Sequence, residues 1–191
     1  PIEDTLGTLD ELVRAGKVRE IGCSNFSVEQ LRAAETAVRD GAARFISVQN
    51  EYSLLHREPE HDVIPECLRS GLAFIPYFPL ASGLLTGKYR RGRPAPQGSR
   101  LQSRIGTDPF TDENLDLVES LLEFAASRKH TLLELAVSWL VAQPAVASVI
   151  AGATSPQQVK ANAAAAGWRL TKAELADIDA LLPHSAHARR T

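Results

Sequence analysis

The stretch GKVREIGCSNF, residues 16–26, decides the fold of this chain. Its first residue, Gly16, ends a pattern of apolar residues at helical spacing that starts near the N-terminus. Residues 18–22 follow this stop as a short strand. Ser27, with Gln30 three residues later, forms a capping box that opens the next helix, and the same pattern recurs at Thr131 with Glu134, Ser155 with Gln158 and Thr171 with Glu174. The sequence here therefore predicts a helix, a strand and a second helix in immediate succession.

The same alternation continues through the rest of the chain. The patterns predict strands at residues 18–22, 45–49, 72–77 and 147–151, and helices over 2–15, 27–39, 62–70 and 112–129, from 131 to just before Pro144, and from 155 and 171 onward. Strands that alternate with helices form a parallel sheet covered by helices. A doubly wound open sheet and a closed (β/α)8 barrel both satisfy this order. Four strands are half of such a barrel, since a complete one needs about 250 residues.

The composition excludes several classes of protein. With 191 residues and 44% apolar content, the chain can bury a core as one domain or a large part of one. A net charge of −2 argues against nucleic acid or a membrane surface as partner. The cysteines, Cys23 and Cys67, are expected to be reduced. Because no apolar run approaches the roughly 20 residues of a membrane helix and no signal pattern is seen, a cytoplasmic location is expected.

Polar residues follow the predicted strands, at the ends where ligands bind in a parallel barrel. These segments are Cys23 to Phe26, Gln49 to Tyr52, Tyr77 to Leu80 and Gly152 to Ser155. Amides and hydroxyls at neighbouring strand ends offer the donors and acceptors that a carboxamide needs, and an aromatic ring can stack on a planar heterocycle. The pattern therefore outlines a nicotinamide pocket. The alternative is that Ser24 and Asn25 only cap a turn and that Tyr77 only packs.

Four segments in this order resemble the second half of the aldo-keto reductases: GKVREIGCSNF, SVQNEYSLL (47–55), YFPLASGLLTGKY (77–89) and VIAGATSPQQVKAN (149–162). Residues 1–19 resemble the helix that follows the fourth barrel strand of that family. The resemblance implies a parallel (β/α)8 TIM-barrel type of α/β fold, incomplete here, with about four C-terminal β/α units in residues 1–183 and a flexible tail over 184–191. It also implies NAD(P)H-dependent reduction of a carbonyl to an alcohol.

The resemblance places the cofactor against three parts of the chain. Ser24, Asn25 and Gln49 would hold the nicotinamide carboxamide, and Tyr77 would stack on the ring. The pyrophosphate would lie against residues 80–88, and the adenosine end would meet residues 152–162. The expected cofactor contacts are Ser24, Asn25, Gln49, Tyr77, Phe78, Leu80, Gly83, Leu84, Lys88, Gly152, Thr154, Ser155, Gln158 and Asn162.

The chain departs from the family pattern at three of these positions. Phe78 stands where the family often has serine, so one hydrogen bond near the phosphates is missing. Gly152 and Gln158 stand where many members have lysine and arginine, which weakens the case for an ion pair with the extra phosphate of NADP. NADP(H) is still expected in preference to NAD(H). A basic loop is either a substitute phosphate contact or a solvated face, and it comprises Lys88, Arg90, Arg91, Arg93, Arg100 and Arg104.

The resemblance also implies that catalytic residues are absent. The family uses a tyrosine as general acid, supported by Asp, Lys and His, and these come from the first four strands, which the resemblance does not cover. We therefore assign no catalytic role to Tyr52, Tyr89, His56 or His130. GLLTGKY is not a P-loop, because Ser82 occupies the place of its first glycine. No Cys/His set has zinc spacing, so no metal site is expected.

Three functions remain open at this point. The chain supplies the cofactor half of a carbonyl reductase, or it is a non-catalytic nucleotide-binding accessory module, or it is an inactive truncated fragment. The expected partner is a small-molecule carbonyl substrate. Because a half barrel has two open sheet edges, a homo-oligomer or a complementing N-terminal half barrel is also expected.

Overall fold

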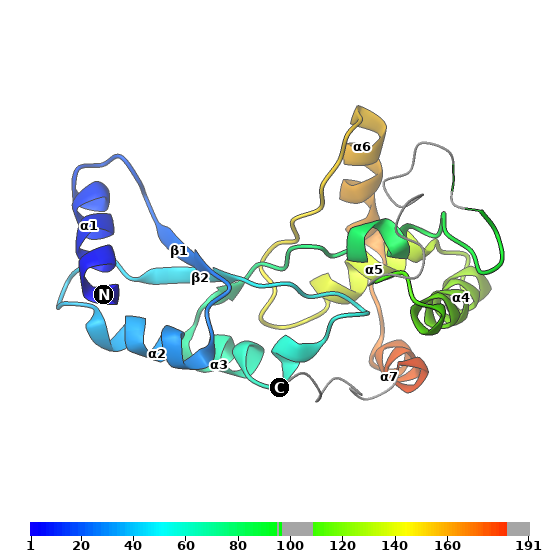
Figure 1. Cartoon of the computed structure of the whole chain (residues 1–191), viewed down its shortest axis with the longest axis horizontal. Helices are drawn as coiled ribbons and strands as arrows, with labels where there is room; N and C mark the ends of the chain where they lie inside the picture. The colour runs from blue at the N-terminus through cyan, green and yellow to red at the C-terminus, as the bar shows by residue number, and fades with distance from the viewer. Residues whose placement is uncertain (95, 97–108, 183–191) are drawn as a thin grey trace.

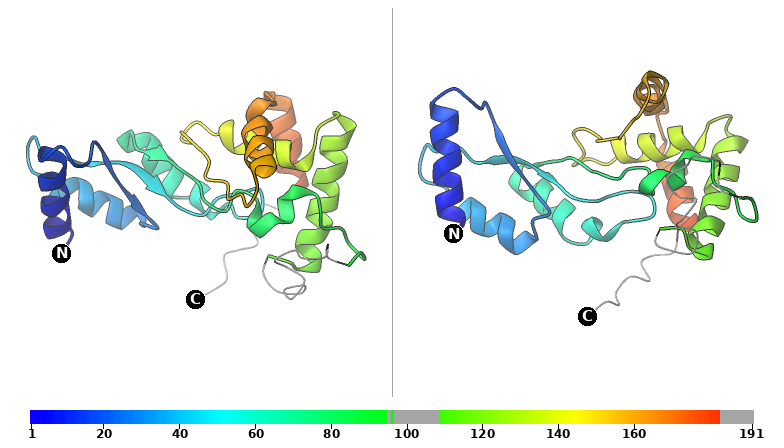
Figure 2. Two further views of the ribbon diagram at one scale, coloured as in Figure 1. Left: turned by 90° about the horizontal axis from the view of Figure 1, so that it is seen from above. Right: turned by 45° about the horizontal axis from the view of Figure 1, so that its top comes forward.

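A computed structural model describes residues 1–94, 96 and 109–182. The molecule is elongated, with α1 and α2 at one end and α4, α5 and α7 at the other (Figures 1 and 2). No helix within the described residues is long and apolar enough to cross a membrane. The helices are α1 (Ile2–Arg14), α2 (Val28–Ala37), α3 (Val63–Ser70), α4 (Asp112–Ser127), α5 (Leu132–Val141), α6 (Pro156–Ala164) and α7 (Lys172–Leu181), the 3-10 helices are η1 (Glu58–Glu60), η2 (Ala81–Thr86) and η3 (Ala165–Gly167), and the strands are β1 (Ile21–Ser24), β2 (Phe45–Gln49) and β3 (Ala73–Phe74).

The strands form one parallel sheet in the order β1, β2, β3. β1 pairs with β2 as far as Ser24, which lies opposite Gln49. β2 pairs with β3 through Ser47 and Val48. The predicted α/β class with parallel strands is therefore confirmed, and the carboxyl ends of the strands lie at one edge of the sheet.

The predicted strand over residues 147–151 is wrong, so the chain has three strands in its described part and not four. A single parallel bridge joins Val146 to Phe74. Beyond it, the N–H of Ala147 donates to the Phe74 carbonyl at 3.1 Å, and the N–H of Ile150 donates to the Pro76 carbonyl at 3.0 Å. Pro76 has no N–H and cannot continue a ladder along this side of β3. The segment therefore runs beside β3 without forming a regular strand.

β1 and β3 are shorter than predicted. β1 begins at Ile21 and not at residue 18, because the N–H of Val18 still bonds to the carbonyl of Leu12 in the turn that ends α1. β3 covers Ala73–Phe74 rather than residues 72–77. The chain beyond β3 nevertheless stays beside β2, since the N–H of Tyr77 donates to the Asn50 carbonyl at 3.1 Å.

Three of the four predicted capping boxes are confirmed, those opened by Ser27, Thr131 and Thr171. In each, the cap side chain accepts the N–H of the residue three positions on, and that residue's side chain accepts the N–H of the cap. The fourth is incomplete. Ser155 accepts the N–H of Gln158, but the Gln158 side chain instead accepts the N–H and hydroxyl of Thr154, at 2.6 and 3.0 Å.

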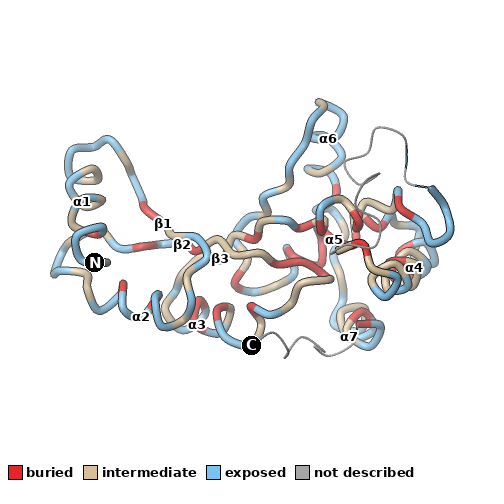
Figure 3. The backbone as a smooth tube through the Cα atoms, viewed as in Figure 1, coloured by how far each residue is buried: buried red, intermediate tan, exposed pale blue. Residues whose placement is uncertain are grey.

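The core has two parts that β2 connects. The larger gathers around α5, where Trp139 is buried with Tyr52 and Val48. The smaller packs α1 and α2 against the starts of β1 and β2 and includes Leu6 and Phe45. Figure 3 shows buried residues along the strands and α5, whereas α6 is exposed and buries no residue.

Some predictions fall outside the described residues. The expected tail over 184–191 lies there, and so do Arg100 and Arg104 of the basic loop. Ala81–Thr86 form η2, where the sequence patterns predict neither a helix nor a strand.

A buried carboxylate joins α2 to α3. The side chain of Glu66 is 3% exposed and accepts hydrogen bonds from Arg69 at 3.0 Å and from Arg32 at 2.9 Å. The two guanidinium groups, Arg69 first, lower the pKa of Glu66 from 4.5 to about 2, against the raising effect of burial.

We expect acid to destabilise the fold through Glu66. Because its pKa is lower in the folded protein, its contribution is complete above about pH 4.5 and is lost as the pH falls toward 2. Both arginines are more than half exposed, so solvent limits the loss to about 2 kcal/mol in the free energy of unfolding. Urea titrations at several pH values measure it. Glu66→Gln should remove this pH dependence. Glu35→Gln, which changes an exposed carboxylate paired with Arg69, should keep it. The reverse pattern would contradict the assignment of the pH dependence to Glu66.

Candidate functional site

The predicted polar segments lie at the carboxyl edge of the sheet. Ser24 ends β1, Gln49 ends β2, and Tyr77 follows β3 while still bonded to the extension of β2. The segment that leads to Gly152 reaches the same edge, because Ile150 bonds to the carbonyl of Pro76. This is the edge at which parallel α/β folds bind ligands.

Hydrogen bonds bring four of the predicted residues together. The Ser24 hydroxyl donates to the Gln49 carbonyl at 3.0 Å, and the Asn25 N–H donates to the same carbonyl at 2.8 Å. The Tyr77 hydroxyl donates to Oδ1 of Asn25 at 2.7 Å. Asn25 has a left-handed φ of 58°, which asparagine adopts more readily than most residues. Asn25 therefore links three strand ends, which goes beyond capping a local turn.

The ring of Tyr77 has a second aromatic neighbour. Phe78 meets it edge to face, with ring centroids 5.3 Å apart and planes at 76°. The backbone of Phe78 is also left-handed, with a φ of 52°, and its side chain is 54% exposed. Tyr77 is half-buried, so the strand ends present an amide, a hydroxyl and aromatic surface side by side.

The loop from Leu80 to Lys88 folds into η2. The N–H of Gly83 donates to the Leu80 carbonyl at 2.8 Å, so this donor, expected to face a phosphate, is engaged within the loop. Leu84 is fully buried, so it presents no surface to a ligand in this structure. Lys88 is exposed, and its ammonium group lies 5.1 Å from the centroid of the Tyr89 ring.

Two arginines of the basic loop face α4. Arg90 donates to Glu119 at 2.8 and 2.6 Å, and Arg91 pairs with Asp116. Arg90 lowers the pKa of the Glu119 carboxyl. For Arg90 and Arg91 this geometry favours the alternative of a solvated, structural surface over a phosphate contact.

The third predicted segment surrounds the N-terminus of α6. Ser155 caps the helix, and Gln158 and Thr154 bond to each other as described above. The Asn162 amide donates to the Gly152 carbonyl at 3.5 Å. The five predicted residues of this segment are thus close together, but Gln158 is engaged by Thr154.

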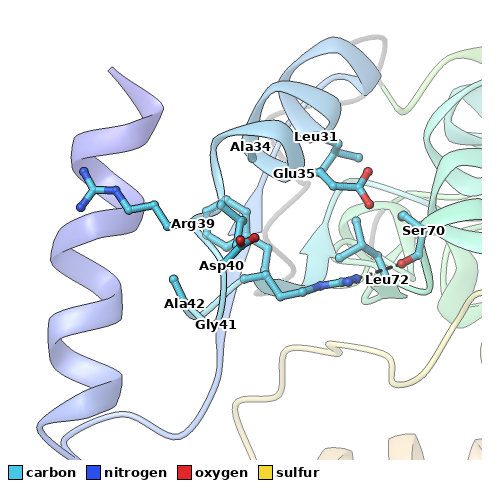
Figure 4. Close-up of a pocket in the computed structure, with 12 residues that line it drawn as sticks. Leu31, Ala34, Glu35, Arg39, Asp40, Gly41, Ala42, Ser70 and Leu72 are labelled. Atoms are coloured by element: carbon cyan, nitrogen blue, oxygen red, sulfur yellow. Dashed lines mark hydrogen bonds between the residues drawn. The ribbon is translucent and has the colours of Figure 1, made fainter.

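Two cavities lie near these elements. One of about 190 Å³ is lined by Asn162 and by apolar side chains that include Val137 of α5 and Val159 of α6. A larger one of about 330 Å³ lies between α2 and the residues that begin β2 and β3, at the opposite ends of the strands (Figure 4). None of the predicted site residues lines the larger cavity. Its lining includes negatively charged carboxylates and positively charged guanidinium groups.

Asn50 joins the site, although its place in the sequence predicts no role for it. Its side-chain nitrogen donates to the Phe26 carbonyl at 3.4 Å, and its Oδ1 is buried with no hydrogen-bond partner among the described residues. A buried acceptor without a donor is uncommon and marks a place for a water or a ligand donor. Its only signal in the sequence was its position directly after Gln49 at the end of β2.

Three other groups capable of proton transfer, on Tyr52, His56 and His130, are engaged elsewhere. Tyr52 is buried and donates to Glu60 at 2.8 Å, and burial, together with the charge of Glu60, raises its pKa. His56 lies 2.7 Å from Glu58. His130 stacks on Trp168 with ring centroids 4.0 Å apart.

The cysteines and acids of the described residues form no metal site. Cys23 and Cys67 are free, and burial raises the pKa of their thiols to about 11 and about 12, so both are protonated at neutral pH. Among residues 1–94, 96 and 109–182, no group of three His, Cys, Asp or Glu side chains is placed to hold a metal ion.

The model of the Aldo/keto reductase family matches residues 1–183. The chain belongs to this family. This aldo/keto reductase chain is 33% identical over 178 residues to the NADH-specific methylglyoxal reductase of Escherichia coli strain K12. The matched region covers 91% of the chain and 52% of that protein. It is also 33% identical to the L-glyceraldehyde 3-phosphate reductase of the same strain, over 94% of the chain and 54% of that protein.

Solved structures agree on the fold. The glycerol dehydrogenase AKR11B4 from Gluconobacter oxydans superposes with a TM-score of 0.80 at 28% identity, over 95% of the chain and 54% of that structure. A thermostable aldo-keto reductase, Tm1743, superposes with a TM-score of 0.73 at 24% identity and shares the fold. The aldo/keto reductase chain therefore has the α/β fold of its family, of the TIM-barrel type, and it spans about half the length of the curated relatives it matches.

Proposed function

We propose that this protein takes part in the NAD(P)H-dependent reduction of a small carbonyl compound to an alcohol, and that residues of this chain hold the cofactor. Membership of an oxidoreductase family supports the reaction class. The names of the relatives refer to methylglyoxal, L-glyceraldehyde 3-phosphate and glycerol, which are small carbonyl compounds or an alcohol. They support a substrate of this class without choosing one compound.

The convergence of Ser24, Asn25, Gln49 and Tyr77 carries the proposal. A nicotinamide carboxamide has an acceptor and a donor, and the hydroxyl and amide groups at the strand ends supply partners for both. Tyr77 stands beside them with a ring that can stack on a planar heterocycle. These residues would orient the nicotinamide toward the substrate, and the bound cofactor supplies the hydride.

We further propose that the general acid is none of the chain's three tyrosines. Tyr52 is buried and bonded to Glu60, and its pKa is raised. The Tyr89 hydroxyl is buried and has no hydrogen-bond partner among the described residues, and the Tyr77 hydroxyl donates a hydrogen bond to Asn25. On this proposal the chain is the cofactor half of a (β/α)8 barrel, and the acid lies on residues beyond it. Without a positioned acid, the rate falls by about 10² to 10⁴.

The choice between NADP(H) and NAD(H) stays a prediction. NADP(H) is the expected cofactor, and the exposed Lys88 is the cation of the described loop that supports it. Gly152 and Gln158 bring no positive charge, and the relative named as NADH-specific gives NADP(H) no support. The cytoplasmic location is likewise still a prediction.

We propose that the outer edge of β1 pairs with further chain. In the part of the protein that the structure describes, β1 has a strand partner on one side, which is β2. Unpaired strand edges recruit other strands. A complementing N-terminal half barrel or a second copy of the chain would satisfy this edge.

The test of the proposed function is a titration of the purified chain with NADPH and with NADH, followed by quenching of Trp139 and Trp168 fluorescence and by nicotinamide emission. We expect saturable binding. After 4-nitrobenzaldehyde is added, we expect no loss of the absorbance of the reduced nicotinamide. Rapid turnover would refute the proposal that the acid lies elsewhere, and failure to bind either nucleotide would refute the cofactor role.

A chimaera separates a reductase from a non-catalytic nucleotide-binding module. The same chain is joined to the first half of the E. coli methylglyoxal reductase, one of its relatives. Turnover of the aldehyde by this chimaera supports the reductase. Binding without turnover in a folded chimaera supports the module.

A further inference from the structure

Phe78 exposes a large apolar ring beside the candidate site. Its side chain is 54% exposed, and it follows Tyr77 directly at the strand ends. Its φ of 52° lies in the left-handed region, where a bulky residue is uncommon. Backbone strain and exposed apolar surface both occur preferentially at binding sites. These two features call for a role beyond that of a surface loop residue.

The contact with Phe78 fixes the rotation of the Tyr77 ring, which the hydrogen bond of the Tyr77 hydroxyl does not fix. The bond from the Tyr77 hydroxyl to Asn25, at 2.7 Å, fixes the far end of the side chain. The ring can still turn about the axis that passes through its hydroxyl, because the terminal torsion of tyrosine is broad. The edge-to-face contact of Phe78, at 5.3 Å and 76°, sets this remaining angle.

We propose that Phe78 is a positioning residue for the cofactor: its ring fixes the tilt of the Tyr77 ring, and through Tyr77 it sets the affinity for the nicotinamide half of the cofactor. This inference rests on the proposed function, in which Tyr77 stacks on the nicotinamide. A serine at this position would offer a hydroxyl to the phosphates and no ring to Tyr77. Phe78 therefore shifts binding from the phosphates toward the nicotinamide.

The test measures the two halves of the cofactor separately. Reduced nicotinamide mononucleotide is titrated by its own emission and by its induced circular dichroism, and ADP-ribose is titrated by calorimetry. The variants are Phe78→Leu, which keeps an apolar side chain and loses the ring, Phe78→Ser, and Phe78→Tyr, which restores a ring. Leu68→Ala is the matched control, because Leu68 is 56% exposed on α3, away from the strand ends.

We expect Phe78→Leu and Phe78→Ser to weaken binding of the mononucleotide by about three- to tenfold and to reduce its induced circular dichroism. Phe78→Tyr should restore both signals, and Leu68→Ala should change neither. ADP-ribose affinity should stay within about twofold in Phe78→Leu, Phe78→Tyr and Leu68→Ala, and Phe78→Ser should keep or raise it, because the serine hydroxyl can bond to the phosphates. If the wild type binds and Phe78→Leu binds the mononucleotide equally well, or loses both halves equally, the inference is overturned while the proposed function stands. A wild type that binds neither half overturns both.

Discussion

Trp139→Ala is expected to lower the free energy of unfolding by about 3–5 kcal/mol, the range for truncating a large buried aromatic side chain. Trp139 is 1% exposed on α5. Its ring centroid lies 5.1 Å from that of Tyr52, and the Arg57 guanidinium lies 5.2 Å from it. Arg57 in turn pairs with Asp179 of α7 at 2.8 Å. The truncation therefore opens a cavity where α5, the segment after β2 and α7 meet.

Urea unfolding followed by circular dichroism measures this loss, since tryptophan fluorescence changes with the substitution itself. Trp168→Ala is the matched control. Trp168 is partly buried and stacks on His130 at the protein surface, so we expect a loss of about 1–2 kcal/mol. Equal losses in the two variants would contradict the central place of Trp139 in the core.

The helices of this fold could be predicted because their signals are local. Thr131 with Glu134, and Thr171 with Glu174, complete their caps within one turn, and the structure confirms both. Ser155 shows the limit of such a pattern. A third neighbour, Thr154, takes the side chain that the cap needed, and the spacing of Ser155 and Gln158 contains no sign of it.

The segment over 147–151 could not be predicted correctly from its own residues. Its apolar pattern indicates burial and an extended chain, and it does run beside β3. Whether it forms a strand depends on the residues opposite, about 70 positions earlier in the sequence. There Pro76 lacks the N–H that a ladder requires. Pairing between distant segments is the part of β-structure that local patterns do not contain.

The candidate site was predictable in its members and not in its contacts. Parallel pairing brings strand ends to one edge, so Ser24, Gln49 and Tyr77 are expected to be neighbours once the strands are known. The bond from Tyr77 to Asn25 and the contact of Phe78 also depend on two left-handed backbone positions. Asparagine gives a weak signal for such a position, and phenylalanine gives none.

Asn25→Gly is expected to weaken binding of reduced NAD(P)H by about 30-fold. The substitution removes the proposed contact with the carboxamide and also the acceptor that orients the Tyr77 ring for stacking, and a loss of about 1 kcal/mol for each effect corresponds to that factor. Glycine is the right replacement, because it adopts a φ of 58° without strain and keeps the N–H that bonds to Gln49. Alanine would add backbone strain to the loss of the side chain.

Fluorescence titrations with the whole cofactor and with its halves measure the effect of Asn25→Gly. Asn162→Ala is the control at the other end of the proposed site: it should weaken ADP-ribose and spare the nicotinamide half, whereas Asn25→Gly should do the reverse. Wild-type affinity in Asn25→Gly would contradict the carboxamide assignment.

Tyr77→Phe removes only the hydroxyl, and we expect it to weaken binding of reduced NAD(P)H by about fivefold. In the double variant the two losses should not add, because both single changes break the same bond between the ends of β1 and β3, and the difference measures that bond.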